Sequence, residues 1–162
     1  MSTFTLRPTR REDLTYIKRL NYLTEVFGDE TQDPHDTFVE NNEFYLDQWD
    51  PHNGGFIAFD EHGIPAGGVW LIDGDNDIHG TGYVHKDVPE LAIAVEKRYQ
   101  RQGLSKMLLD AAIQLCRDTN HPAVSLCVHD NNPGARKAYE KKGFVEHSYD
   151  PERQYTTMYL RV

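Results

Sequence analysis

The 162-residue sequence lacks several features that mark common classes of protein. It has two cysteines, too few for a disulfide framework, and its longest unbroken apolar run, residues 91–95, is far shorter than the roughly 20 residues that span a bilayer. No charged and then apolar leader opens the chain, so we expect the mature protein to start where the sequence starts. These absences exclude a disulfide-rich secreted domain and a transmembrane protein, and they favour a cytoplasmic globular protein.

Basic residues are missing from a long part of the chain. Between Leu20 and His85 there is no Lys or Arg, whereas 14 Asp and Glu residues lie there. The other residues carry all 17 Lys and Arg with 12 acids, a local net charge of +5 within a total of −9. Because nucleic-acid binding needs clustered Lys and Arg, this balance argues against a nucleic-acid partner.

The apolar periodicity predicts strands and helices that alternate along the chain. Strands are predicted at residues 4–7, 56–59, 66–72, 91–95, 124–128, 145–149 and 155–160. Helices are predicted after Thr9, over Pro34–Gln48, from Gly103 onward and over residues 135–142. This order predicts a mixed α/β sheet in a single domain that spans residues 1–162.

Several positions within these elements carry more specific signals. Thr9 and Glu12 have the spacing of a capping box, and Pro122 is expected to end the helix that begins after Gly103. Gly143 suits the left-handed position that follows a helix. Cys116 and Cys127 are predicted to be small core residues, because each lies in an apolar stretch. The apolar face of the long helix is predicted to comprise Leu104, Met107, Leu108, Ala111 and Leu115.

The segment 91–106 carries the clearest sign of chemistry. It combines a short apolar strand, a turn and a helix start that lacks acids, and such a start presents unpaired N–H groups and a positive dipole end to an anion. Gly103 lets the backbone approach a ligand closely, and Arg98, Arg101 and Lys106 add positive charge. Converging amides favour a diphosphate, while an ordinary strand-turn-helix is the structural alternative. The segment is neither a P-loop nor a dinucleotide fingerprint.

Two runs of residues resemble the GNAT superfamily of N-acetyltransferases. Residues 100–105, Gln-Arg-Gln-Gly-Leu-Ser, resemble its motif A, Gln/Arg-x-x-Gly-x-Gly/Ala, except that Ser105 stands at the last position. Residues 132–144 resemble its second signature, Asn-x-x-Ala-x-x-x-Tyr-x-x-x-Gly-Phe, and the N-terminal half resembles the family more loosely. The resemblance implies a central mixed, mostly antiparallel sheet of six to seven strands flanked by about four helices. It also implies that the strand at 91–95 is splayed at a bulge.

The resemblance further implies an acetyl-CoA-dependent N-acetyltransferase that transfers acetyl directly to a primary amine of a small molecule or peptide N-terminus, without a metal. The Ile93 amide is expected to face the thioester carbonyl, and the Val95 backbone to pair with pantetheine. Tyr139 is expected to protonate the leaving thiolate, although a core aromatic is the alternative, as an N-cap is for Asn132. The residues implied to bind acetyl-CoA are Ile93, Ala94, Val95, Gln100, Arg101, Gln102, Gly103, Leu104, Ser105, Lys106 and Asn132.

The acceptor amine must lose a proton before it attacks, so a general base is expected. Glu90 is the first candidate, because it is the last acid before the strand and the small Ala92 and Ala94 share its parity. His85 and Asp87 are the next candidates, and a solvated strand-end carboxylate is the alternative for Glu90.

Two further functions remain open at this point: a regulatory module that binds acetyl-CoA without turnover, and an adenine-nucleotide binder that uses the anion site alone. The acceptor is expected to be cationic, because the acidic stretch 20–85 would attract it; the alternative is that these acids are solvated and only aid solubility. Neither a membrane partner nor a nucleic-acid partner is expected, and a homodimer, common in the superfamily, is neither favoured nor excluded. The aromatic residues that either line an acceptor pocket or pack in the core are Phe38, Phe44, Tyr45 and Trp49.

Overall fold

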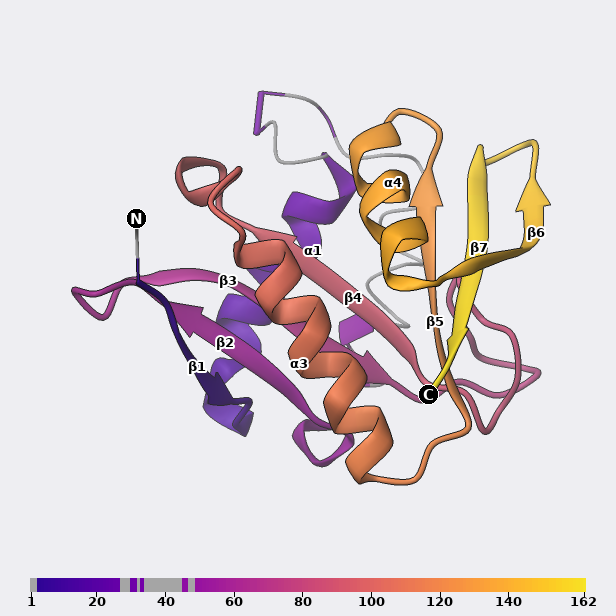
Figure 1. Ribbon diagram of the computed structural model, residues 1–162, viewed down its shortest axis with the longest axis horizontal. Coiled ribbons are helices and arrows are strands. Elements are labelled where there is room, and N and C mark those ends of the chain that lie inside the picture. The colour runs from indigo at the N-terminus through magenta and orange to yellow at the C-terminus, as the bar shows by residue number, and fades with distance from the viewer. Residues whose placement is uncertain (1–2, 27–29, 32, 34–44, 47–48) are drawn as a thin grey trace.

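The computed structural model describes residues 3–26, 30–31, 33, 45–46 and 49–162. Within them, a seven-stranded sheet has the strand order β1-β2-β3-β4-β5-β7-β6 (Figure 1). The strands are β1 (Thr5–Pro8), β2 (Gly55–Phe59), β3 (Pro65–Ile72), β4 (Glu90–Val95), β5 (Ala123–His129), β6 (Val145–Asp150) and β7 (Tyr155–Arg161). The α-helices are α1 (Leu14–Glu25), α3 (Leu104–Asp118) and α4 (Pro133–Lys142).

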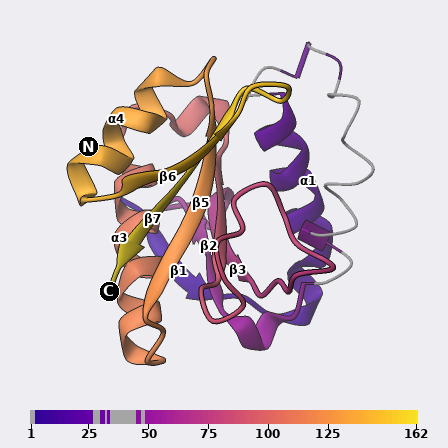
Figure 2. The same cartoon turned by 90° about the vertical axis from the view of Figure 1, so that its right-hand side faces the viewer.

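The helices cover both faces of the sheet. Helix α1 lies on one face, and α3 and α4 lie on the other, as both Figure 1 and Figure 2 show. Each face has its own apolar cluster. The α1-side core contains Ile17, Leu20, Tyr45, Trp49 and Trp70, among others. The α3-side core contains Leu91, Val95, Leu104, Leu108 and Leu126, among others.

Strands β4 and β5 diverge near the middle of the sheet. Strand β4 pairs with β3 in an unbroken antiparallel register from Glu90 to Val95. With β5 it forms only one parallel pair, Glu90 with Ser125, so the two strands separate beyond that point. The expected bulge in the strand at 91–95 is therefore wrong. The sheet opens between two regular strands instead, and strand parity continues through β4.

The predicted order of elements is confirmed wherever the structure describes the chain. The helix predicted over Pro34–Gln48 lies almost wholly outside the described residues, of which only Tyr45 and Leu46 belong to it. The described residues thus hold three α-helices rather than about four, while the sheet has the seven strands of the upper estimate. None of the helices in this part of the chain is both long and apolar enough to cross a membrane.

The predicted capping box is wrong: the carboxylate that bonds back to the N-cap amide is Asp13 rather than Glu12, and the N-cap, Arg10, has no side-chain acceptor to complete the box. The Arg10 amide donates to the Asp13 carboxylate (2.7 Å), and the Asp13 amide donates to the Arg10 carbonyl (3.0 Å). Thr9 cannot take this role, because its own amide donates to the Gly55 carbonyl and extends the pairing of β1 with β2. Tertiary pairing therefore moved the start of the helical segment.

The predicted face and end of α3 also need correction. Met107 is 40% exposed, whereas Leu109, Ala112, Ile113 and Cys116 are buried with Leu104 and Leu108. The buried face is centred on residues 104, 108 and 112, because that row packs on the sheet. The helix ends at Asp118, before Pro122, where Asn120 takes a left-handed conformation (φ 61°) and the His121 amide caps the Cys116 carbonyl.

The predicted end of α4 is confirmed. Gly143 is left-handed (φ 103°), and the amides of Gly143 and Phe144 donate to the carbonyls of Glu140 and Tyr139. Phe144 is only 2% exposed, so the cap also anchors α4 to the α3-side core.

Candidate active site

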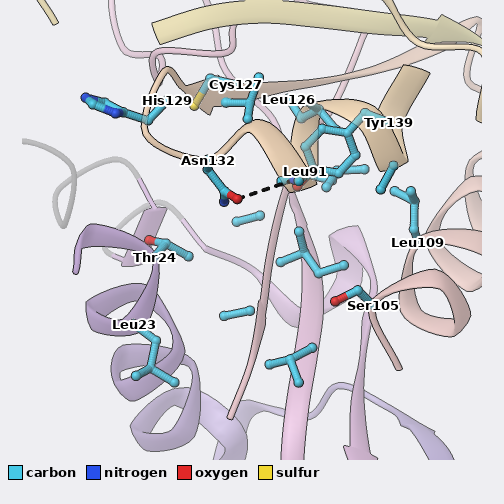
Figure 3. Close-up of a pocket in the computed structure, with 18 of the residues that line it drawn as sticks. Leu23, Thr24, Leu91, Ser105, Leu109, Leu126, Cys127, His129, Asn132 and Tyr139 are labelled. Atoms are coloured by element: carbon cyan, nitrogen blue, oxygen red, sulfur yellow. Dashed lines mark hydrogen bonds between the residues drawn. The ribbon is translucent and has the colours of Figure 1, made fainter. Parts of the chain in front are cut away.

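A cleft of about 1010 Å³ opens where β4 and β5 diverge. Residues of α1, β4, β5, α4 and the start of α3 line it, and Figure 3 shows Leu23 and Thr24 facing it from one side and Ser105 and Leu109 from the other. The cleft lining includes all the predicted site residues except Gln102, whose amide nitrogen donates to the Arg98 carbonyl. They are Glu90, Ile93, Ala94, Val95, Gln100, Arg101, Gly103, Leu104, Ser105, Lys106, Asn132 and Tyr139.

The start of α3 forms one end of the cleft. Gly103 is its N-cap, no side chain caps the helix, and its first turn contains no acid. The first helical hydrogen bond runs from the Met107 amide to the Gly103 carbonyl, so the preceding amides are left for a ligand. These amides and the positive end of the helix dipole suit an anion.

The turn before α3 contains two residues in left-handed conformations. Gly103 has φ 80° and Arg101 has φ 62°. A Cβ at Gly103 would meet no protein atom within 4 Å, so its backbone conformation, rather than crowding inside the protein, requires glycine. Left-handed Arg101 could not be foreseen from the motif, and strain of this kind is common where a turn serves a ligand.

The edge of β4 that faces β5 is open along the cleft. The Ser125 amide donates to the Pro89 carbonyl (3.0 Å), which directs the backbone groups of odd-numbered residues of β4 toward β5. Beyond Leu91 the two strands part, so the N–H and C=O groups of Ile93 and Val95 face the cleft. An extended ligand can therefore pair with this edge as a further strand does.

Asn132 and Tyr139 approach the cleft from α4 and the residue before it (Figure 3). Asn132 is the N-cap of α4, where its Oδ1 accepts a hydrogen bond from the Ala135 amide (3.3 Å), so the structural alternative considered for it is present. Tyr139 is half-buried beside Phe144, with ring centroids 5.9 Å apart. Burial and the nearby Cys127 raise the pKa of the Tyr139 hydroxyl, which keeps it protonated at neutral pH.

Glu90 lies at the other end of the cleft and is only 2% exposed. Its Oε2 accepts a hydrogen bond from the Tyr45 hydroxyl, while its Oε1 is buried without a hydrogen-bond partner among the described residues. Burial raises the pKa of Glu90 to about 7, against the opposing effects of Tyr45 and the nearby Gly82 amide. A carboxyl with this pKa can take up a proton near neutral pH.

The other candidate bases lie elsewhere. His85 and Asp87 are exposed, contact each other (3.6 Å) and are absent from the cleft lining. His129, the last residue of β5, does line the cleft and packs edge-on against Tyr155. Of the residues considered, Glu90 thus has the position and the pKa of a base.

Two residues of the cleft were assigned elsewhere or left ambiguous by the sequence. Cys127 was predicted to be a core residue, as Cys116 is, but it is only half-buried and lines the cleft. It faces the α1 side of β5, because Leu126 and Val128 occupy the other side. Tyr45 belongs to the core and also lines the cleft. Its contact with Glu90 could not be predicted from the sequence, because the two residues lie 45 positions apart.

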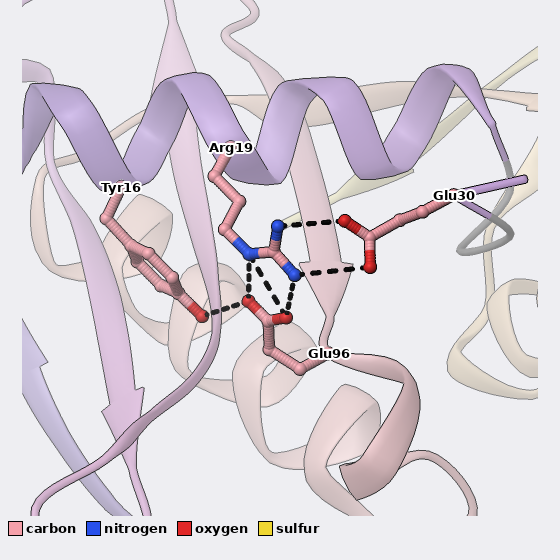
Figure 4. A network of polar contacts seen from close by, with 4 residues as sticks. All are labelled: Tyr16, Arg19, Glu30 and Glu96. Atoms are coloured by element: carbon pink, nitrogen blue, oxygen red, sulfur yellow. Dashed lines mark hydrogen bonds and ion pairs between the residues drawn. The ribbon is translucent and has the colours of Figure 1, made fainter. Parts of the chain in front are cut away.

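A polar network ties α1 to the chain just beyond β4 (Figure 4). Arg19 donates to both carboxylate oxygens of Glu96 (2.6 and 2.9 Å), Tyr16 donates to the same group (2.8 Å), and Arg19 also pairs with Glu30 (2.9 Å). Although burial opposes it, Arg19 and Tyr16 hold the pKa of Glu96 below its ordinary value. The network thus anchors the turn that leads to α3.

Comparison with known proteins gives a consistent result. A family model described as the acetyltransferase (GNAT) family matches residues 20–144. A spermidine N(1)-acetyltransferase of Vibrio cholerae is 28% identical over 150 residues, which cover 91% of this chain and 82% of that protein.

Solved structures agree. The crystal structure of a spermidine N-acetyltransferase from Vibrio cholerae in complex with CoA and spermine has a TM-score of 0.66 at 26% identity and covers 98% of this chain and 95% of its own. A GNAT-family acetyltransferase from Staphylococcus aureus has a TM-score of 0.67 at 19% identity, over 98% of this chain and 99% of its own, and shares the fold.

Proposed function

This chain belongs to the acetyltransferase (GNAT) family, and we propose that its acceptor is an aliphatic amine with further positive charges, of the polyamine class. The general reaction is the acetyl-CoA-dependent N-acetylation of an amine, and the acceptor is a cationic small molecule. The buried Glu90 carboxyl, at the end of the cleft away from α3, is the feature of the site that most directly supports an amine acceptor.

The residues present fit CoA at the α3 end of the cleft. The amides from Arg101 to Lys106, which have no backbone partner among the described residues, and the Lys141 side chain provide the positive end that a diphosphate needs, whereas Lys142 pairs with Asp110. The open edge of β4 at Ile93 and Val95 offers backbone donors and acceptors to the pantetheine arm. We assign the cofactor-binding role to these residues together with Asn132.

The chemistry follows from groups placed along the same edge. The amine nitrogen forms a bond to the thioester carbonyl carbon, the C–S bond breaks, and the Ile93 amide stabilises the negative charge that develops on the carbonyl oxygen. The acceptor starts as an ammonium ion and loses two protons: Glu90 takes the first before the attack, passes it to solvent, and takes the second as the amide forms. Tyr139 gives its hydroxyl proton to the leaving thiolate and regains one from solvent. The products are the N-acetylated amine, CoA as a thiol and one proton released to solvent.

Glu90 is active as a base only when it is ionised. Because its pKa lies at about 7, the proposed reaction accelerates as pH rises through neutrality. Burial keeps the carboxylate poorly solvated, which makes it a stronger base than an exposed glutamate.

The polyamine class is supported by charge and by the relatives. Glu90 is the one carboxyl group among the described residues that line the cleft, so the additional charges of a polyamine must find acids outside it. The stretch 20–85 supplies such acids without any Lys or Arg. The two Vibrio cholerae relatives at 28% and 26% identity are spermidine N-acetyltransferases.

An acceptor panel tests this proposal. We expect spermidine to exceed an alkyl monoamine in kcat/KM by about tenfold or more, measured as release of free CoA thiol. Preference for an aminoglycoside or for a peptide with a free N-terminus would contradict the polyamine assignment.

The same panel, combined with CoA binding, distinguishes the enzyme from a regulatory module that binds acetyl-CoA without turnover. Thermal stabilisation by CoA, with no thiol release on any amine, would indicate a regulatory module. Absence of stabilisation by CoA would instead show that the cleft is not the CoA site.

A further inference from the structure

Tyr45 and Glu90 form a buried polar pair on the α1 side of the sheet. The Tyr45 hydroxyl donates to Glu90 Oε2, and the same hydroxyl oxygen lies 4.0 Å from the Cys127 sulfur. Both residues line the cleft, yet 45 positions separate them in the sequence. The contact therefore exists only because the chain before β2 packs across the sheet.

The position of the Tyr45 hydroxyl is fixed by packing of the ring and by a hydrogen bond to the Tyr45 backbone. The Tyr45 ring belongs to the α1-side core with Leu46 and Trp49, and its carbonyl accepts a hydrogen bond from the Trp70 indole (3.4 Å). Core packing and this backbone contact restrict movement of the ring. The hydroxyl thus has a set position from which to meet a carboxylate.

The carboxyl of Glu90 is confined on its other side by Gly82. A Cβ at Gly82 would lie 2.9 Å from Glu90 Cδ and 2.7 Å from the Leu126 carbonyl carbon, so only glycine fits there. The neighbouring Thr81 is tied to β7, because its carbonyl accepts a hydrogen bond from the Thr157 hydroxyl (2.9 Å). Glu90 is thus clamped between the Gly82 backbone and the Tyr45 hydroxyl.

The clamp leaves the two carboxylate oxygens in different states. Oε2 is engaged by Tyr45, whereas Oε1 has no hydrogen-bond partner among the described residues. We propose that Tyr45 is a positioning residue for the acceptor base: its hydroxyl holds Oε2 of Glu90, so that Oε1 is presented to the acceptor amine and the carboxylate is stabilised in its charged form. This inference rests on the proposed role of Glu90 in the reaction.

The groups around the pair include no cation among the described residues, so stabilisation of the Glu90 carboxylate depends on neutral hydrogen-bond donors such as Tyr45. Among the described residues, the titratable group that approaches the pair is the Cys127 thiol of β5, and the uncharged Ser125 lies opposite Glu90 in the sheet. The Tyr139 hydroxyl of α4 lies near Cys127. Burial and the hydrogen bonds of Tyr45 and Gly82 account for the pKa of Glu90, without a contribution from a neighbouring cation. Of these two hydrogen bonds, the one from Tyr45 lowers the pKa more, so the Tyr45 hydroxyl is the more important donor for ionising this carboxyl.

Tyr45→Phe removes the hydroxyl and keeps the ring. We expect the acidic limb of the kcat/KM profile for spermidine to move by about one pH unit toward higher pH, with the rate on the alkaline plateau close to that of the unchanged protein. CoA affinity, measured by calorimetry, is expected to stay unchanged and serves as the check on folding. Tyr149→Phe is the matched control, because it also removes a tyrosine hydroxyl bound to a carboxylate (Asp130, 2.7 Å) but lies on the exposed strand β6.

A cycle with Glu90→Gln identifies the route of the effect. If Tyr45 acts through Glu90, Glu90→Gln abolishes the acidic limb, and adding Tyr45→Phe changes the pH profile no further. A Tyr45→Phe profile with an unmoved acidic limb, or with an equal loss at every pH, would overturn the inference while leaving the role of Glu90 intact.

A second readout does not depend on turnover. The infrared carbonyl band of the protonated Glu90 carboxyl, identified by its loss in Glu90→Gln, is expected to persist to higher pH in Tyr45→Phe. Titration of this band at the same pH in both proteins would contradict the inference even if no acceptor were turned over. Failure of every amine as substrate, with the band shifted, would refute the proposed function and leave the Tyr45–Glu90 coupling in place.

Discussion

Two glutamates at the ends of one strand show how strongly surroundings set the chemistry of a residue. Glu90 and Glu96 are both buried on the α1 side, at 2% and 7% exposure. Glu96 meets the Arg19 guanidinium and the Tyr16 hydroxyl, which hold its pKa below the ordinary value against burial. Among the described residues Glu90 instead meets the neutral Tyr45 and Gly82, and burial raises its pKa to about 7. The first is a permanently charged anchor, and the second can exchange a proton at neutral pH.

Tyr139, the proposed general acid, can also be tested by changing a single residue. Tyr139→Phe is expected to lower kcat by about 100-fold or more, because the leaving thiolate loses its proton donor, while CoA affinity stays nearly unchanged. Steady-state kinetics with calorimetry of CoA binding measures the two effects separately. Full activity, or a loss of CoA binding, would contradict the role that we assign to the hydroxyl.

At the scale of an element, the start of α3 joins two features that the sequence encodes independently. One is the absence of acids in the first turn, and the other is the left-handed backbone at Gly103. Together they leave the amides of the turn unpaired at the cleft, where the dipole of a 15-residue helix favours negative charge. The network of Arg19 and Glu96 holds the preceding turn against α1.

Gly103→Asp is expected to weaken CoA binding by about tenfold or more, because a carboxylate would replace the anion in front of the helix. Gly63→Asp is the matched control: its φ is 77° against 80° for Gly103, and a Cβ at either glycine meets no protein atom within 4 Å. The two changes thus carry the same backbone strain and the same charge. Equal CoA affinity of the two variants would place the diphosphate elsewhere.

Across the whole molecule, charge is divided between the cofactor end of the cleft and the acidic stretch of the chain. Four basic residues line the cleft: Arg101 and Lys106 at the start of α3, and Lys141 and Lys142 at the end of α4. None of the acids of residues 20–85 is among the described residues of the lining, so any effect of theirs on an acceptor acts at longer range. Such an effect is sensitive to screening by salt.

The KM for spermidine is therefore expected to rise several-fold between about 0.01 M and about 0.15 M ionic strength, where the Debye length falls from about 30 Å to about 8 Å. An alkyl monoamine, with a single charge, is expected to show a smaller rise in parallel assays. A KM for spermidine that is independent of salt would show that the acidic stretch does not steer the acceptor.

The sequence by itself determined the order of strands and helices, the glycine cap after α4 and the acid-free start of α3 at Gly103. These features depend on neighbours within a few residues, such as Gly143 before Phe144 or the acid-free turn after Gly103, so local pattern and motif suffice to predict them. The capping box failed because it competed with a distant strand. The Thr9 amide donates a hydrogen bond to the Gly55 carbonyl, so the helical segment begins one residue later.

Only the tertiary structure decided which side chains share the cleft. Cys127 and Cys116 lie in similar apolar stretches, yet Cys127 lines the opening between β4 and β5 while Cys116 is buried on the core-facing side of α3. Tyr45 reaches Glu90 across 45 positions, and no periodicity relates residues so far apart. Sheet order and the divergence of β4 from β5 set these contacts, because long-range pairing and packing, rather than local propensity, bring such groups together.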